Sequence, residues 1–368
     1  MSSQWTPSLV EHVRAQALAQ GFDLCGVASA HAAAEPGGAL TAQRFTAWIA
    51  AGRAGEMDYL KRRDDGGELL RASARQAMPW ARSVIVCALN YSSAGPVSLD
   101  NHDQTSGWIA RYAWSGDERG QPTDYHDDLM RRLLPIEAAL QECAPCQTKS
   151  YVDTGPLLER DFAARAGIGW VGKNTCVLNQ GLGSWLLLAV IVTSLEVPDV
   201  VAVMAPDRCG SCTRCIDACP TDALVAPREM DASLCIAYLT IEKKGSIADD
   251  LRAKMGRQVF GCDICQEVCP WNRSAPTSMA SGLTPRAQLI NPGLEWLASL
   301  DQPAFREHFR GSPLERTKRH RLHRNVAIAM GNSGDLSFVP RLEAWAAGDD
   351  PVLAEAAGWA IERLPPVG

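Results

Sequence analysis

The chain has 368 residues with a formal net charge of −6, and 46% of its residues are hydrophobic. This composition predicts a globular protein of two or three domains and excludes a disordered chain or a generally basic nucleic-acid binder. The first residues lack a basic segment followed by an apolar one, and the longest apolar run, residues 185–192, is too short to span a membrane. We therefore expect a cytoplasmic protein without membrane attachment.

The first 200 residues alternate helical and strand-like patterns. Thr6 and Pro7 predict the start of a helix that ends near Gly21, and a second helix is expected before Gly52. A further helix is expected over residues 129–140, where a proline should kink or split it. The expected strands are residues 22–28, 83–89, 149–152 and 185–192. We interpret this part as an α/β sandwich around a mixed sheet.

Strand patterns disappear beyond Pro285. Short amphipathic helices are expected over residues 326–330, 339–346 and 352–364, and their spacing resembles one or two HEAT-like helical repeats. The fold class expected for the whole chain is α+β. The expected domains are an α/β sandwich over residues 1–200, a two-cluster ferredoxin-like domain over residues 201–285 and a helical region over residues 286–368.

The cysteines are the strongest signal, because eight of the thirteen fall between Cys209 and Cys269. The first run has the spacing C-x2-C-x2-C-x3-C-P of bacterial ferredoxins, in which the fourth cysteine binds a second cluster. A second run ends in the same Cys-Pro, and Cys235 can supply its missing leading ligand. The crossed assignment gives cluster one Cys209, Cys212, Cys215 and Cys269, and cluster two Cys219, Cys235, Cys262 and Cys265.

Structural zinc is the main alternative for this region, since paired C-x2-C motifs also bind zinc. Two halves that both end in Cys-Pro favour two 4Fe-4S clusters instead. Cys25 and Cys87 lie in apolar strands and are expected in the core. The Cys143-x2-Cys146 pair follows a helix rather than opening one, which argues against a thioredoxin-like site. The sequence does not decide the role of Cys176.

The residues before the clusters contain no dinucleotide or P-loop motif. Asp153 ends an expected strand before a Gly-Pro turn, where a carboxyl group with a raised pKa could act as a general acid; capping of the next helix is the alternative. The Gly-rich loop of residues 167–184 could let the backbone approach a large ligand, or it could be an ordinary loop. In the Asp124-Tyr-His126 segment, His126 could be a ligand or part of a helical turn.

These segments together resemble the epoxyqueuosine reductases, cobalamin-dependent iron–sulfur enzymes of queuosine synthesis in tRNA. The two cysteine runs match, and so do, in the same order along the chain, residues 55–60, 81–85, 111–113, 124–126, 151–160, 169–174, 238–242 and 324–325. Two segments depart from the family pattern: residues 115–123, which look like an insertion, and residues 62–67.

The resemblance implies reduction of the epoxide of epoxyqueuosine to the alkene of queuosine at the wobble position of the anticodon. The clusters would pass electrons from an unidentified low-potential donor to cobalamin, which would bind without a histidine ligand to cobalt. Asp153 would be the proton donor. The residues that the resemblance and the Gly-rich loop place near cobalamin are Asp153, Lys173, Asn174, Ala237, Thr240, Cys262 and Asp263.

A basic run between Arg306 and Arg324 stands out in this acidic chain. It carries seven Lys or Arg residues against two Glu, which fits a phosphate-binding surface, although a solvated helix face is the commoner meaning of such a run. The residues expected to contact tRNA are Lys243, Lys244, Arg319, Arg321, Arg324 and Asn325. The protein is expected to act as a monomer.

Two other functions are compatible with part of this pattern. A reductive dehalogenase-like enzyme would use the same cofactors on a small halogenated molecule. Such enzymes typically carry an N-terminal twin-arginine signal, whereas the arginine pairs of this chain are internal. A ferredoxin-like electron carrier or an RNA-binding adaptor would not need so large an α/β region. The sequence therefore favours a member of the epoxyqueuosine reductase family.

Overall fold

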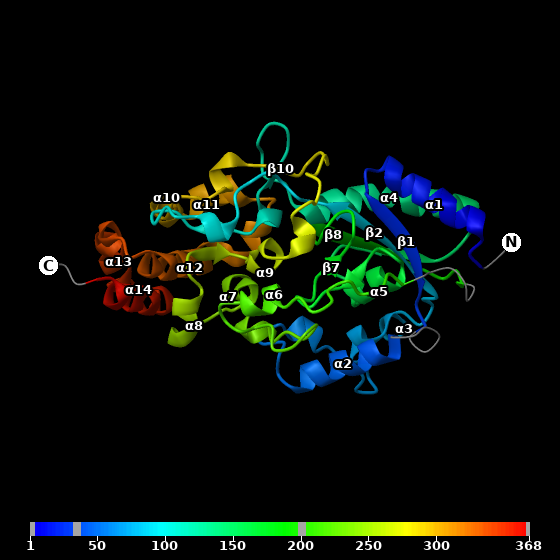
Figure 1. Cartoon of the computed structure of the whole chain (residues 1–368), viewed down its shortest axis with the longest axis horizontal. Coiled ribbons are helices and arrows are strands. Elements are labelled where there is room, and N and C mark those ends of the chain that lie inside the picture. Colours follow the sequence, from blue (N-terminus) through cyan, green and yellow to red (C-terminus); the bar gives the residue numbers. More distant parts are fainter. Residues whose placement is uncertain (1–3, 32–37, 198–203, 366–368) are drawn as a thin grey trace.

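The computed structural model describes residues 4–31, 38–197 and 204–365. A sheet with its helices lies at one end of the molecule, a set of helices lies at the other end, and the cysteine-rich segments lie between them (Figure 1). The chain is thus a mixture of helix and sheet, as the sequence predicts. The boundary expected at residue 200 lies outside the described residues.

The main sheet has four strands in the order β1-β2-β8-β5. All three strand pairings are antiparallel, so the expectation of a mixed sheet is wrong here. Strands covered on both faces read as continuous apolar runs, and such runs do not reveal strand direction. The strands are β1 (Leu24–Ser29), β2 (Ser83–Asn90), β8 (Leu186–Thr193) and β5 (Thr148–Tyr151), each within two residues of its expected range.

Successive side chains of each strand point to opposite faces of this sheet, and helices cover both faces. The odd-numbered residues of β2 pack against α1 (Pro7–Ala19) and α4 (Tyr125–Cys143), and the even-numbered ones pack against α5 (Glu159–Arg165). Thr6 caps α1 by accepting a hydrogen bond from the backbone of Leu9, as its sequence predicts. The proline inside α4 does not split that helix. The N-terminal region is therefore a three-layer sandwich.

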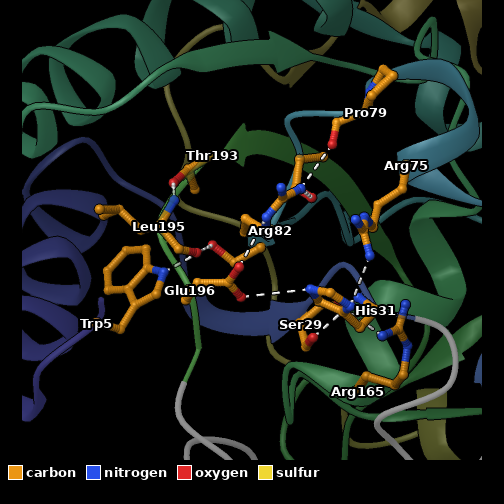
Figure 2. A network of polar contacts seen from close by, with 12 residues as sticks. Trp5, Ser29, His31, Arg75, Pro79, Arg82, Arg165, Thr193, Leu195 and Glu196 are labelled. Carbon is orange, nitrogen blue, oxygen red and sulfur yellow. Dashed lines mark hydrogen bonds and ion pairs between the residues drawn. The ribbon is translucent and has the colours of Figure 1, made fainter. Parts of the chain in front are cut away.

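A polar network fastens the N-terminal segment to the end of this sheet (Figure 2). The Trp5 indole donates a hydrogen bond of 2.8 Å to the Ser83 hydroxyl. Glu196 pairs with Arg82 at 2.9 Å and lies 3.6 Å from the His31 ring. These contacts join segments that are far apart in sequence and hold the edge of the sandwich together.

A second core lies toward the other end of the molecule and joins parts of all three expected domains. It combines β3 (Trp108–Ile109), β9 (Gln258–Phe260), α7 (Ile236–Ile241) and the C-terminal helices. β3 pairs with β9 in parallel, although the two strands belong to different expected domains. The chain is therefore divided less cleanly than the sequence pattern predicts.

The C-terminal region is helical in the described residues. The three expected helices fall within α12, α13 and α14, although α12 begins earlier than expected because it includes the basic run. No helix among the described residues is long and apolar enough to cross a membrane. The helices are α10 (Leu294–Ser299), α11 (Gln302–Phe309), α12 (Lys318–Ser333), α13 (Val339–Ala346) and α14 (Pro351–Arg363).

Candidate active site

The two cysteine runs adopt the same local structure. Each carries a short helix, α6 (Arg214–Asp217) in the first and α9 (Ile264–Glu267) in the second, and these helices contact each other. The final cysteine of each run closes its turn with a backbone hydrogen bond of 3.1 Å, from Cys219 to Ile216 and from Cys269 to Gln266. A proline follows three residues after each helix has ended, and because it cannot donate a backbone hydrogen bond it prevents either helix from continuing.

The thiols gather in two sets. Burial, together with the neighbouring Cys209 and Cys215, raises the pKa of Cys269 to about 11. Burial likewise raises the pKa of Cys262, with Cys235 and Cys219 adding to the effect. The structure thus brings Cys269 to the first run, and Cys219 and Cys235 to the second run. Thiols that repel one another as thiolates in this way suit a positively charged iron–sulfur core.

These sets do not suit a single metal ion. Within the part of the chain that the structure describes, no three His, Cys, Asp or Glu side chains converge closely enough to hold one ion. A four-iron cube keeps its thiolate ligands further apart than a tetrahedral zinc ion does. The donor set therefore fits two iron–sulfur clusters better than structural zinc.

Cys176 lies beside the second set, a position that the sequence left undecided. The Cys265 thiol donates a hydrogen bond to Cys176, which raises the pKa of Cys265 and lowers that of Cys176, and burial raises the pKa of Cys265 further. Cys176 belongs to a hairpin of β6 (Trp170–Val171) and β7 (Val177–Leu178) within the Gly-rich loop. The loop therefore packs onto the cysteine-rich region.

Gly169 and Gly172 of this loop leave room for close packing within its own hairpin. A Cβ on Gly169 would lie 2.0 Å from the Leu178 carbonyl oxygen. Lys173 donates to the carbonyls of Gly210 and Cys212 at 2.7 and 2.9 Å, and Asn174 donates to the Cys265 carbonyl at 3.3 Å. Both side chains thus hold the cysteine runs in place.

Asp153 follows β5 and adopts a left-handed backbone conformation, with φ of +56°. Its side chain is 62% exposed. The Tyr125 hydroxyl donates a hydrogen bond of 3.2 Å to one Asp153 carboxylate oxygen, and the His126 ring lies 4.0 Å from the same oxygen. Since α5 begins only at Glu159, the alternative that Asp153 caps this helix is wrong.

The Asp124-Tyr-His segment opens α4 and holds Asp153 from one side. Asp124 caps the helix by accepting from the His126 backbone, and its carboxylate lies 2.6 Å from the His126 ring. Burial would raise the pKa of Asp124, but the hydrogen bonds with His126 lower it overall. A negative Asp124 therefore orients the ring of His126 beside Asp153.

Aromatic residues connect Asp153 with the second cysteine set. Tyr112 packs edge-to-face on Tyr125, with ring centroids 5.8 Å apart, and lies 6.0 Å from the ring of Phe260 in β9. The strand β9 leads directly to Cys262 and Asp263. The negative charges of Asp153 and Asp263 both raise the pKa of Tyr112 beyond the effect of its burial. Tyr112 thus lies between the candidate acid and the candidate cluster ligand.

Three side chains expected beside cobalamin are turned to internal contacts. Asp263 is buried and accepts hydrogen bonds from the Trp108 indole and the Arg111 backbone, and burial raises its pKa to about 7. The buried hydroxyl of Thr240 donates to the Ile236 carbonyl. The buried side chain of Asn174 donates to the Cys265 carbonyl. Ala237 and Cys262 are partly exposed.

The residues expected to contact tRNA divide into two kinds. Arg324 and Asn325 are 1% and 0% exposed. The Arg324 guanidinium donates to the carbonyls of Leu239, Lys243 and Gly245, so it has no free face for a phosphate. This burial is at odds with direct contact between these two residues and RNA. The sequence shows the charge of an arginine but not its tertiary contacts, so it could not reveal that Arg324 is buried.

The other members of this group lie nearer the surface. Arg321 is half-buried and donates to three backbone carbonyls, including that of Ile241 at the end of α7. Lys243 pairs with Glu56, whereas Lys244 is exposed. Arg319 is half-buried. Lys318, which is not among the six expected residues, lies at the start of α12 and is exposed.

Comparisons with known proteins show which family this chain resembles. Residues 71–154 match the family model "Epoxyqueuosine reductase QueG, DUF1730", and residues 208–272 match a 4Fe-4S double cluster binding domain. An epoxyqueuosine reductase of Xanthomonas campestris pv. campestris is 33% identical over 355 residues, covering 95% of both chains. The chain belongs to the epoxyqueuosine reductase family. The enzyme of Synechocystis sp. is 39% identical over 298 residues, covering 77% of this chain and 93% of its own.

Solved structures of epoxyqueuosine reductases have the same fold. One crystal structure has a TM-score of 0.85 and 30% identity, and covers 98% of this chain and 91% of its own. A second, with a tRNA-Tyr epoxyqueuosine-modified stem loop, has a TM-score of 0.83 and 30% identity, and covers 97% and 90%. Members of the family depend on cobalamin in addition to the two 4Fe-4S clusters.

Several residues around Asp153 were not predicted from the sequence. Tyr125 lies in the Asp124-Tyr-His126 segment, but histidine is the commoner ligand and base, so the segment indicated His126 instead. Tyr59 and Glu159 also lie within electrostatic reach of Asp153, and Arg71 lies beside both of them. No local pattern could have joined them, because their contacts cross from one segment of the chain to another.

Proposed function

We propose that this protein reduces epoxyqueuosine to queuosine at the wobble position of tRNA, the last step of queuosine formation. The observation that supports this most directly is the placement of Asp153. This exposed carboxyl group is held by Tyr125 and is joined through Tyr112 to the segment that carries Cys262. Membership of the epoxyqueuosine reductase family supports the same substrate.

The residues present fit the cofactors of the family. Eight thiols in two sets suit two 4Fe-4S clusters, assigned as the crossed pattern predicts. Glu159, which senses the charge of Asp153, and the neighbouring Arg71 each have a buried atom, Oε1 and Nε, without a hydrogen-bond partner. A corrin carries amide side chains that donate and accept hydrogen bonds, so a bound cobalamin could satisfy such atoms. When bound, these groups supply low-potential electrons to the site.

Asp153 has a defined task in this reaction. Conversion of the epoxide to an alkene consumes two electrons and two protons and releases the oxygen as water. The departing oxygen needs a proton, and an acid directed at it lowers the barrier. Asp153 delivers this proton, while Tyr125 and His126 hold its carboxyl group from one side.

Finer features of the proposal follow the sequence. The chain comprises a cobalamin-binding domain over residues 1–200, a two-cluster domain over residues 201–285 and a HEAT-like region over residues 286–368. The exposed Lys244 and Lys318, with Arg319, contact tRNA. Arg321, Arg324 and Asn325 support α7 instead. The protein acts as a cytoplasmic monomer that receives electrons from a low-potential donor.

An Asp153→Asn variant tests the proposed acid. Wild type, this variant and Asp127→Asn, a control at an exposed position of α4, are reconstituted anaerobically with iron, sulfide and cobalamin. Each is incubated with reductant and an epoxyqueuosine-containing stem loop. We expect Asp153→Asn to lose at least about a hundred-fold in kcat with full cofactor content, since general acids contribute about 10²–10⁴-fold. An unchanged kcat would remove Asp153 from this role. Turnover of a halogenated phenol in place of the stem loop would favour the dehalogenase alternative.

A further inference from the structure

Tyr59 is an exposed aromatic residue at the candidate active site. It lies in the short helical turn η1 (Asp58–Leu60), and 44% of its surface is exposed. Two guanidinium groups flank its ring, with the Cζ atoms of Arg71 and Arg316 each 6.0 Å from the ring centroid. These residues come from distant parts of the sequence, so the arrangement is a product of the fold.

Both arginines have partners of their own. Arg71 donates a hydrogen bond of 2.9 Å to the Leu157 carbonyl and lies 3.9 Å from Glu159. Arg316, whose side chain is about half exposed, pairs with Glu242 at 2.5 Å, at the end of α7. Cation–π attraction at such distances is modest, and it adds to these contacts in placing the two guanidinium groups beside the ring.

The turn that carries Tyr59 is anchored to α7 as well. The Glu56 backbone donates to the Tyr238 hydroxyl at 2.8 Å, and the Lys244 backbone donates to the Glu56 carboxylate at 3.0 Å. At Gly55, which has a φ of +55°, any Cβ would collide with the Tyr238 ring at 2.5 Å. The turn that carries Tyr59 is therefore held against α7, the helix that follows Cys235.

The Tyr59 side chain lies within electrostatic reach of Asp153, the candidate acid. Burial raises the pKa of the Tyr59 hydroxyl, and the negative charges of Glu242 and Asp153 raise it further. The Asp153 charge likewise favours the charged form of Arg316. A ring placed here is near any group that Asp153 protonates.

We infer that Tyr59 is a stacking platform for an unstacked nucleobase of the tRNA anticodon loop, flanked by Arg71 and Arg316. Single-stranded RNA is recognised by stacking of splayed bases on aromatic side chains and arginine planes. A rigid, half-exposed ring between two guanidinium groups has the chemistry for this task. The inference rests on the proposed function, because it takes the anticodon loop as the substrate.

Substitutions at Tyr59 separate stacking from other roles. We expect Tyr59→Phe to keep the affinity for the stem loop within about two-fold. We expect Tyr59→Leu to weaken binding and raise KM about ten-fold or more, since one base on one aromatic ring contributes about 1–3 kcal/mol. The kcat should stay within about three-fold. Leu134→Ala, at an exposed position of α4, is the control and should bind as wild type does.

The salt dependence of binding gives a second readout. Stacking releases no counterions, so Tyr59→Leu should lower affinity without changing the slope of log affinity against log salt concentration. Affinity is measured directly by fluorescence anisotropy of a labelled stem loop. This measurement does not depend on turnover. The stacking role of Tyr59 can therefore fail while the proposed function stands, and the proposed function can fail while the stacking role stands.

Two outcomes would overturn the inference. Tyr59→Leu with wild-type affinity and KM would show an ordinary surface tyrosine. A variant that binds the stem loop normally but loses cobalamin, measured by absorbance after desalting, would assign the ring to the corrin. Failure of wild type to convert a bound stem loop would contradict the proposed function alone.

Discussion

The cysteine-rich region and the basic helix α12 teach opposite lessons about charged and reactive residues. In residues 209–269, Cys269 lies near Cys209 and Cys215, and Cys262 lies near Cys219 and Cys235, which supports the crossed ligand assignment proposed above. In α12, half of the residues expected to face RNA are turned inward, and Arg324 is 1% exposed. Both regions carry a dense run of one residue type, but only the first run has a spacing with chemical meaning.

The difference has a physical cause. A cluster imposes short spacings on its ligands, because three thiolates must reach one cube from a few turns of backbone. An arginine imposes no such spacing, since its long side chain finds either phosphates or carbonyls within reach. The role of each arginine is therefore set by tertiary contacts. Four variants test this difference.

The largest expected effect comes from a cysteine ligand. Cys262→Ala should reduce the iron content after reconstitution from about eight to about four per chain, because it removes one ligand of the second cluster. Conversion of the stem loop should fall below detection. Iron is measured by colorimetric assay, and the clusters are counted by electron paramagnetic resonance after reduction.

The matched control is Cys143→Ala, which replaces an exposed thiol outside both sets. It should keep full iron content and activity. Loss of iron in this control, or full iron in Cys262→Ala, would contradict the assignment of ligands.

Arg324→Met should cost about 3 kcal/mol of unfolding free energy. Removing one partner of a buried, hydrogen-bonded charged group leaves the carbonyls of α7 and the following turn without donors. The measurement is urea unfolding of the reconstituted protein under anaerobic conditions. Lys318→Met, an exposed change on the same helix, should shift stability by no more than about 0.5 kcal/mol. Equal effects of the two changes would erase the distinction between inward and outward charges.

Glu159 extends this distinction to an acid. Burial raises its pKa from 4.5 to about 7, and the Asp153 charge adds to the rise. Between pH 4.5 and 7 the native state therefore holds a proton that the unfolded chain has released. Stability falls as the pH rises through this window, by up to about 1.4 kcal/mol per pH unit. The loss of folding stability caused by ionising the buried Glu159 is fully present above pH 7.

Glu159→Gln should remove this cost. Urea unfolding of wild type and variant at pH 6, 7 and 8 should show the variant gaining relative stability as the pH rises. Since other groups titrate in both proteins, the difference between them is the quantity to follow. Parallel curves would mean that Glu159 stays ionised in the fold.

The smallest effect is expected from the exposed lysines. The double change Lys244→Gln and Lys318→Gln should reduce the salt slope of stem-loop binding by about 1–2, because each phosphate contact releases less than one counterion. Stability should stay unchanged. Arg14→Gln, on the distant helix α1, is the control for net charge. An unchanged slope would remove these lysines from the RNA surface.

Much of this molecule was predictable from sequence, for reasons that particular residues make plain. Strands such as Ser83–Asn90 are read from apolar runs, and the N-cap Thr6 is read from its proline neighbour. Strand direction was not readable, because fully buried strands lack alternation. The sequence left the role of the Gly-rich loop open, because it does not show that Gly169 and Gly172 pack against Leu178 within their own hairpin. The Tyr59 platform could not be read at all, because Arg71 and Arg316 reach it from distant segments.

The most direct test of the central claim is mass analysis of the wobble nucleoside after anaerobic incubation of wild type with the epoxyqueuosine-containing stem loop and reductant. The enzyme is first shown to hold about eight irons and one cobalamin per chain. The account predicts loss of one oxygen atom from the nucleoside, with two electrons consumed per queuosine formed. An unchanged nucleoside in the fully loaded enzyme would contradict it.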